Sequence, residues 1–289
     1  MPLPTSAIDI RRHSMNDLFW FVLSKDRPLQ LDALLRSMHA MVSATAPCVV
    51  LYKTSNDRYQ RAYADVFNRH RDMQLDVVPD QDFKADVFNI VRTRQYPRVA
   101  FLVDDQVFVA PVNLKKILTL DPNFATYSLR LGKRITRSQP LGNIETGHPP
   151  FLTLDGLPEE WLAWHWAKGT GDWQGANCLD GNVLSRAMVL AAFEHPIAAR
   201  ISGPQTLEMS LAASGIATKI GICSVEPQVV NLAANRVSEE QYWYPHGTAT
   251  ADTLLGAWES GYQLSLGLVR NFPADSCHII CDLPLERRS

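Results

Sequence analysis

The stretch of sequence that decides the fold covers residues 96–109 and reads YPRVAFLVDDQVFV. Its apolar run at residues 99–103 is long enough for one buried strand. Asp104 and Asp105 follow at once, and because an unpaired carboxylate is costly to bury, they belong at the end of that strand. Open α/β sheets bind ligands beyond the carboxyl ends of their strands, so the stretch predicts a binding site there.

The adjacent carboxylates of Asp104 and Asp105 indicate a cation between them, because two such charges repel each other when nothing separates them. Oxygen-rich sites with few protein ligands suit Mg²⁺ or Mn²⁺, which keep bound waters and accept substrate phosphates. A turn with both side chains in water explains the same dipeptide equally well. The dipeptide alone leaves both interpretations open.

Around this stretch the chain alternates short apolar runs with segments of helical periodicity. Strands are expected at residues 18–23, 47–52, 75–78 and 99–103, and helices at residues 28–42, 59–67 and 83–91. This alternation predicts a mostly parallel sheet with helices on both faces. Right-handed crossovers then bring the loops that follow the strands to one rim. That rim would collect Lys25, Asp26, Arg27, Ser55, Asn56, Asp104 and Asp105.

Composition narrows the class of protein. The 289 residues carry a net charge of −2, which does not suggest a general nucleic-acid binder. No apolar run approaches the length of a membrane helix, and the N-terminus lacks the apolar core of a signal peptide. The five scattered cysteines favour buried free thiols, and a cytosolic protein is the default expectation.

Gly169 and Gly171 are followed by Gln174 in place of a third glycine, so a dinucleotide-binding fingerprint is not present.

The second half has a less regular pattern. A short helix is expected at residues 111–120, a strand at 125–132 and a long loop at 132–160, followed by helices at 183–193, 206–212 and 253–268 and late strands at 219–225 and 278–283. Thr206 is expected to cap its helix, which places Glu208 in the first turn, where the helix dipole favours a carboxylate. Trp161, Trp164, Trp166 and Trp173 form a cluster that suits either a core or an exposed platform for a sugar ring.

Five segments taken in order resemble the GT-A-fold glycosyltransferases, which use nucleotide-sugar donors. They are residues 24–31, 101–108, 173–182, 204–208 and 231–237. The first resembles a nucleotide loop, especially that of bacterial surface-polysaccharide enzymes, and the second resembles the Asp-x-Asp segment. The next two are similar to acceptor-side elements, and the last is similar to an Asn-rich stretch near the end of the catalytic core. The likeness covers residues 17–270.

The resemblance implies a GT-A-like α/β fold with a single mostly parallel, mixed sheet. After an N-terminal arm at residues 1–16, one catalytic domain would span residues 17–289, with a Rossmann-like nucleotide-sugar-binding half at 17–110 and an acceptor-side half at 111–289. The implied activity is sugar transfer from a nucleotide-sugar to a glycan or lipid-linked saccharide in bacterial polysaccharide or lipopolysaccharide synthesis. The implied setting is the cytoplasm, with peripheral contact at the inner face of the membrane for a lipid-linked acceptor.

The resemblance also implies roles for individual residues. The implied donor-binding residues are Ser24, Lys25, Arg27, Ser55, Lys84, Asp104 and Asp105, and the implied acceptor-binding residues are Trp173, Asp180 and Asn182. Asp180 is preferred as general base, with Glu208 as its rival, and Asp105, Gln106 and His246 are the implied ligands of Mn²⁺ or Mg²⁺. Gln106 departs from the family, which commonly has an acidic residue there, so the need for metal stays open.

Two other functions compete with transfer. A nucleotide-sugar- or glycan-binding protein that has lost catalysis would explain Gln106. A nucleotidyltransferase can also alternate strands and helices, but residues 24–30 contain none of the glycines usual in its first loop. Because inverting and retaining transferases share one fold, the stereochemistry of transfer does not follow from the fold.

Overall fold

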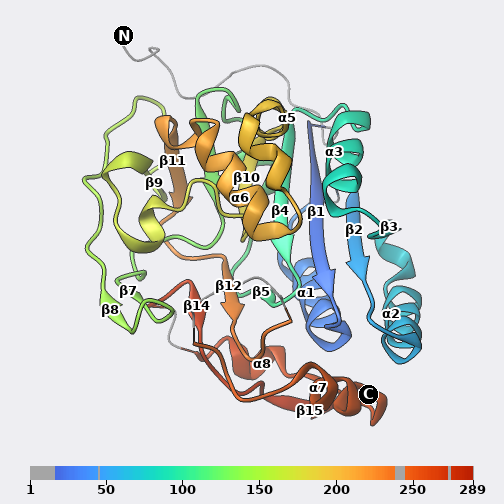
Figure 1. Ribbon diagram of the computed structural model, residues 1–289. Helices are drawn as coiled ribbons and strands as arrows, with labels where there is room; N and C mark the ends of the chain where they lie inside the picture. Colours follow the sequence, from blue (N-terminus) through green and yellow to red (C-terminus); the bar gives the residue numbers. More distant parts are fainter. Residues whose placement is uncertain (1–16, 45, 238–244, 273–274, 289) are drawn as a thin grey trace.

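The computed structural model describes residues 17–44, 46–237, 245–272 and 275–288. A mixed sheet of eight strands runs through it in the order β3-β2-β1-β4-β10-β6-β11-β9 (Figure 1). In that order the strands are Leu75–Pro79, Cys48–Lys53, Leu18–Lys25, Arg98–Val103, Asn182–Ser185, Ala125–Ser128, Ile220–Ser224 and Trp161–His165. The predicted arm, residues 1–16, lies outside the described residues.

The first four strands are parallel, as the sequence predicts. β1 lies between β2 and β4, and β2 pairs in turn with β3. The registers join Lys25 to Lys53 and Leu23 to Val103, so these strands end side by side. Their carboxyl ends therefore form one rim, from which the first loop and the Asp104–Asp105 pair both emerge.

Helices cover both faces of the sheet (Figure 1). The longer ones are α1 (Pro28–Met41), α2 (Asp57–Arg69), α3 (Phe83–Thr93), α5 (Arg186–Glu194), α6 (Pro204–Ala213) and α7 (Ala251–Glu259). Successive side chains of a strand point to opposite faces, so the apolar run of β1 serves two cores. Leu18, Trp20 and Val22 pack in the core that includes α1, α2 and α7. Phe19, Phe21 and Leu23 pack in the core that includes α3, α5 and α6.

One predicted helix is in part a strand. Residues 183–193 were expected to be helical throughout, but β10 occupies their start and α5 begins only at Arg186. β10 is fully buried and runs antiparallel to both β4 and β6, with Val183 opposite Ala100 and Tyr127. This central position, which local periodicity does not reveal, overrides the helical pattern of the sequence.

Smaller elements complete the chain. They are α4 (Leu114–Ile117), α8 (Leu266–Val269), the strands β5 (Gln106–Phe108), β7 (Arg137–Ser138), β8 (Ile144–Glu145), β12 (Val229–Leu232), β13 (Tyr262–Leu264), β14 (His278–Ile279) and β15 (Leu285–Arg287), and 3-10 helices at Arg71–Met73, Trp166–Lys168, Gly171–Gln174, Pro196–Arg200 and Ile216–Thr218. β14, β12 and β5 form a second sheet, and β13 pairs with β15.

Three further expectations need correction. The predicted helix at residues 253–268 stops at Glu259, because Gly261 adopts a φ of 82° and leads into β13. Thr206 is the third residue of α6 and not its cap: Gly203 holds the cap position, and the Thr206 hydroxyl accepts a hydrogen bond from the Gly203 amide. The loop at residues 132–160 contains the β7–β8 hairpin. Across the described ranges, no helix is both long and apolar enough to cross a membrane.

Candidate active site

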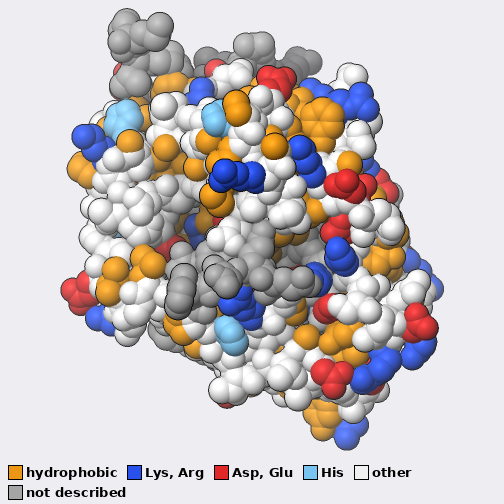
Figure 2. All heavy atoms as spheres, in the orientation of Figure 1, with side chains coloured by type: hydrophobic (Ala, Val, Ile, Leu, Met, Phe, Trp, Pro, Cys, Tyr) orange, Lys and Arg blue, Asp and Glu red, His pale blue; other side chains and the backbone are white. Residues whose placement is uncertain are grey.

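A cleft of about 880 Å³ opens at the carboxyl rim of β1, β2 and β4. The first half of the chain contributes Lys25, Arg27 and Asp104 to its lining, and the second half contributes Asp180 and Glu208. On the face shown in Figure 2, basic and acidic side chains are interspersed. Side chains from both halves of the chain, to which the resemblance gives donor and acceptor roles, therefore meet in one cleft.

The first loop is fixed to the rim through Asp104, whose side chain is 4% exposed. Its Oδ2 accepts hydrogen bonds from the Ser24 hydroxyl at 2.9 Å and from the Lys25 backbone amide at 3.1 Å. Its Oδ1 accepts a third from Arg27 Nη1 at 3.0 Å. Burial raises the pKa of Asp104 to about 6, although the charge of Arg27 opposes that rise. Ser24 and Asp104 are thus joined at the mouth of the cleft.

Asp105 faces the same guanidinium. Arg27 Nη1 lies 3.0 Å from Asp105 Oδ2, and Asn231 donates a hydrogen bond to Asp105 Oδ1 at 3.2 Å. Burial raises the pKa of this carboxyl too, and Arg27 again opposes the rise. Arg27 Nη2 also donates to the Asn235 carbonyl, so β12 and the segment after it close this side of the site.

The structure does not support the predicted metal ligands as one set. Gln106 is fully buried: its Oε1 accepts a hydrogen bond from the Val103 amide at 3.0 Å, and its Nε2 donates to Asn231. His246 lines the cleft, with Nδ1 2.8 Å from the Gly247 carbonyl oxygen. Throughout the described ranges, no three His, Cys, Asp or Glu side chains gather as a metal site. With Arg27 between the two aspartates, these residues do not fit a divalent cation.

Ser55 and Lys84, both predicted to bind donor, do not belong to the cleft lining. The Ser55 amide donates to Asp26 Oδ1 at 2.8 Å, and its hydroxyl donates to the other carboxylate oxygen. Asp26 has a φ of 51°, a strained backbone conformation for a residue other than glycine. This pair fixes the first loop against the second, so Ser55 acts on the shape of the site without lining the cleft.

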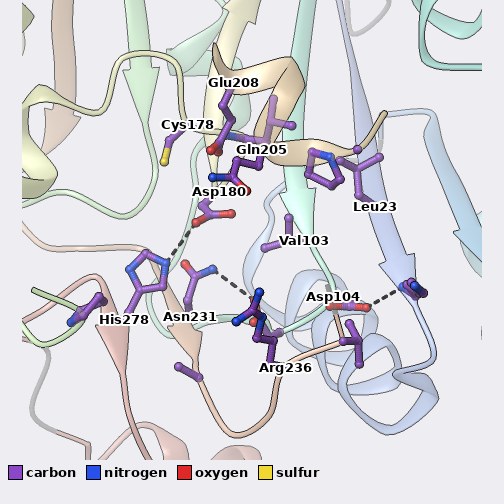
Figure 3. Close-up of a pocket in the computed structure, with 18 of the residues that line it drawn as sticks. Leu23, Val103, Asp104, Cys178, Asp180, Gln205, Glu208, Asn231, Arg236 and His278 are labelled. Carbon is purple, nitrogen blue, oxygen red and sulfur yellow. Dashed lines mark hydrogen bonds and ion pairs between the residues drawn. The ribbon is translucent and has the colours of Figure 1, made fainter. Parts of the chain in front are cut away.

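In the part of the lining from the second half of the chain, Asp180 belongs to a charged network that sequence patterns did not predict. His278 Nε2 lies 3.1 Å from Asp180 Oδ2 (Figure 3). The buried Arg130 Nη1 lies 3.7 Å from the same oxygen. Burial alone would raise the pKa of Asp180, but the hydrogen bond and charge of His278 and the charge of Arg130 outweigh it and lower that pKa. Asp180 is therefore held as an anion.

Glu208 has the opposite electrostatic setting. Its side chain is half-buried beside Asp180 and Gln205 (Figure 3), and its Oε1 accepts a hydrogen bond from the Leu179 amide at 2.8 Å. Burial, and then the negative charge of Asp180, raise the pKa of Glu208 to about 7. Near neutral pH this carboxyl can take up a proton and give it back.

Two predicted acceptor residues are structural. Trp173 is fully buried, packs edge-on against Trp164 with ring centroids 5.0 Å apart, and donates from Nε1 to the Ile135 carbonyl. An indole without exposed surface cannot stack on a sugar, so the core interpretation of the tryptophan cluster holds for Trp173. Asn182, also fully buried, donates to the carbonyls of Gly175 and Ala176 and shapes the loop below Asp180.

No family model matches the sequence, and no curated protein matches it. Solved structures with a similar arrangement include a mannosyltransferase, PcManGT from Pyrobaculum calidifontis, in complex with GDP-Man and Mn²⁺, at 15% identity and a TM-score of 0.36 over 48% of this chain and 45% of that one. Another is GalNAc-T7 with UDP, GalNAc and Mn²⁺, at 10% identity and a TM-score of 0.44 over 76% of this chain and 48% of that one. The present chain spans less than half the length of each. The likeness is partial, and the activity has to be argued from the residues of this chain.

Proposed function

We propose that this chain is a glycosyltransferase that moves a sugar from a nucleotide-sugar donor to a saccharide or lipid-linked saccharide. One observation carries the proposal: a single cleft has cationic side chains, Lys25 and Arg236, in its lining, together with a half-buried carboxyl group, Glu208, whose pKa is raised to about 7. The cationic groups suit a diphosphate, and the carboxyl group suits a proton transfer. A role in bacterial polysaccharide synthesis rests on the sequence resemblance alone.

The transfer requires charge stabilisation and removal of one proton. The oxygen of an acceptor hydroxyl attacks the anomeric carbon, the new C–O bond forms, and the bond from that carbon to the diphosphate breaks. The bonding electrons leave with the nucleoside diphosphate, where negative charge develops. Lys25 and Arg236 line the cleft and would stabilise that charge. The hydroxyl proton passes to a carboxylate at the acceptor side.

We assign the role of general base, which accepts that proton, to Glu208. A general base works best when its pKa lies near the operating pH, which describes Glu208 and not Asp180. Asp180 Oδ2 already faces His278 and Arg130, and its anionic form is stabilised. We therefore give Asp180 two roles: it binds the acceptor, and it keeps the pKa of Glu208 high. The resemblance instead favoured Asp180 for acceptor binding or general base, with Glu208 as the rival base.

The proposal is tested with purified protein and a panel of nucleoside diphosphates, followed by the matching nucleotide-sugars. A ligand that binds only the folded state raises the unfolding midpoint, so binding of one nucleoside diphosphate identifies the donor class. The corresponding nucleotide-sugar should then release nucleoside diphosphate, slowly into water and faster with a saccharide acceptor.

Three outcomes would redirect the assignment. Binding without transfer or hydrolysis would favour a protein that has lost catalysis. Release of pyrophosphate from a nucleoside triphosphate and a sugar phosphate would favour a nucleotidyltransferase. No binding of any nucleotide by a well-folded sample would refute the glycosyltransferase proposal.

A further inference from the structure

We propose that the guanidinium of Arg27 takes the place of a divalent cation between Asp104 and Asp105, so that this site works without metal. For the donor, this means that the nucleoside diphosphate binds equally well with and without Mn²⁺, a consequence that rests on the proposed function. The metal-binding part concerns the three side chains alone and stands independently of it.

The first support is the position of Arg27. One nitrogen, Nη1, lies 3.0 Å from Asp104 Oδ1 and 3.0 Å from Asp105 Oδ2, which puts it between the two carboxylates. Nη2 is held by the Asn235 carbonyl, so the guanidinium is fixed from a second direction. The Arg27 side chain is only 11% exposed. A buried cationic group therefore already compensates this pair of charges.

The second support is that the outer carboxylate oxygens are also engaged. Asp104 Oδ2 accepts hydrogen bonds from the Ser24 hydroxyl and the Lys25 amide, and Asp105 Oδ1 accepts one from Asn231. All four oxygens of the pair thus have donors from the protein. These donors come from β1, from the loop after it and from β12, so the pair joins three segments together.

The third support is electrostatic. A divalent ion bound between Asp104 and Asp105 would stand within a few ångströms of the positive guanidinium, and like charges at that distance repel strongly in a partly buried site. Gln106, the nearest oxygen donor in sequence, is fully buried with its Oε1 committed to the Val103 amide. The pair therefore lacks both the charge and the additional ligand that Mn²⁺ needs.

The fourth support is that two further cationic side chains lie in the same lining as Arg27. Lys25 and Arg236 line the cleft together with Arg27, against the two carboxylates of Asp104 and Asp105. Arg27 offsets part of the repulsion between the two aspartates and a bound diphosphate, and the positive charges of Lys25 and Arg236 attract the diphosphate.

The first experiment measures Mn²⁺ binding alone, by the loss of the electron paramagnetic resonance signal of free Mn²⁺. The variants are Arg27→Met, Arg27→Lys and the control Arg58→Met, because Arg58 also joins two acidic residues but at the exposed surface. We expect Arg27→Met to bind Mn²⁺ at least about tenfold more tightly than the wild type. The control should show no such gain. Adding Asp105→Asn to Arg27→Met should remove it.

The second experiment measures nucleoside diphosphate binding to the wild type in EDTA and in Mn²⁺. We expect affinities that agree within about twofold, since the cation is built into the protein. Stronger binding of Mn²⁺ by the wild type than by Arg27→Met, or nucleotide binding that requires Mn²⁺, would overturn the inference. If no nucleotide binds, the proposed function fails, and the Mn²⁺ comparison still decides the role of Arg27. If Arg27→Met does not fold, the wild-type measurement decides the inference, because nucleotide binding that requires Mn²⁺ would overturn it. Arg27→Lys keeps the positive charge, so it should show no gain in Mn²⁺ binding.

Discussion

Replacing Glu208 with Gln tests the assignment of the general base. Gln keeps the size of the side chain and an Oε1 that can accept the 2.8 Å hydrogen bond from the Leu179 amide, so the loop around Asp180 should stay in place. What the variant loses is the ability to accept a proton. Removing a positioned general base typically costs about 10²- to 10⁴-fold in rate, and we expect kcat to fall by that amount with KM for the donor little changed.

The pKa of Glu208 fixes the pH dependence that should accompany this loss. With a pKa of about 7, the carboxylate fraction rises from about one tenth at pH 6 to about nine tenths at pH 8. Wild-type kcat/KM should therefore rise about tenfold over that interval, whereas the residual rate of Glu208→Gln should be nearly flat. Initial rates of nucleoside diphosphate release between pH 5.5 and 8.5 measure both.

The same variant has a stability signature that separates catalysis from misfolding. Because the folded-state pKa of Glu208 is raised, ionisation of this carboxyl costs folding free energy as the pH rises above the unfolded value, near 4.3. Glu208→Gln avoids that cost, so its unfolding midpoint at pH 8 should equal or exceed that of the wild type. A variant that is stable, fully active and unchanged in its pH profile would refute the role of Glu208.

Three further predictions concern residues with different roles. Asp180→Asn removes a negative charge that raises the pKa of Glu208, so the rising limb of the pH–rate profile should move to lower pH; an unmoved limb would show that the two carboxyls are not coupled. Asp32→Asn should lower the free energy of unfolding by about 3–5 kcal/mol in urea titrations at pH 7, because it leaves Arg36, Arg69 and His70 around a buried site without its carboxylate. Burial alone would raise the pKa of Asp32, but His70 and Arg36 lower it. The stabilisation from Asp32 is therefore present above the unfolded-state pKa, about pH 4, and is lost as the pH falls through the lower folded-state pKa. A wild type that is equally stable at pH 3 and pH 7 would contradict this. Trp173→Ala should cost about 3–5 kcal/mol of stability, measured by thermal unfolding, since the ring is fully buried; a stable variant impaired only in acceptor binding would restore the sugar-platform interpretation.

The first half of the fold could be predicted because its strands are buried on both faces and its helices are amphipathic. The run at residues 18–23 is apolar without a break, as a central parallel strand requires, and α1 begins at Pro28 as the sequence indicates. β10 could not be predicted, because Val183 and Leu184 lead into α5 with no glycine or proline between them. Its strand conformation depends on partners far away in the sequence.

The site, too, could be predicted only in part from the sequence. Strand adjacency was enough to bring Arg27 and Asp104 to one rim, but the sequence did not indicate that Arg27 would stand between the aspartates. The contact of Asp180 with His278 spans 98 residues, and no local motif marks it. Arg130 gave a weak signal, as a charged residue inside an expected strand, and its partners become visible only in the folded chain. Long-range pairing of charges is the part that sequence patterns did not supply.

The reversed direction of β10 has a consequence for how the two halves of the cleft can change independently. Since this strand runs against β4, its amino end meets the rim, and Asp180 precedes its strand, whereas Arg27 and Asp104 follow theirs. Gly181, with a φ of 76°, makes the connection and donates its amide hydrogen to the Phe101 carbonyl of β4. The loop that carries Asp180 is thus anchored to β4 by this backbone hydrogen bond. A change of length between β9 and Asp180 should therefore alter the side of the cleft that carries Asp180, while the loops around Lys25 and Asp104 keep their shape.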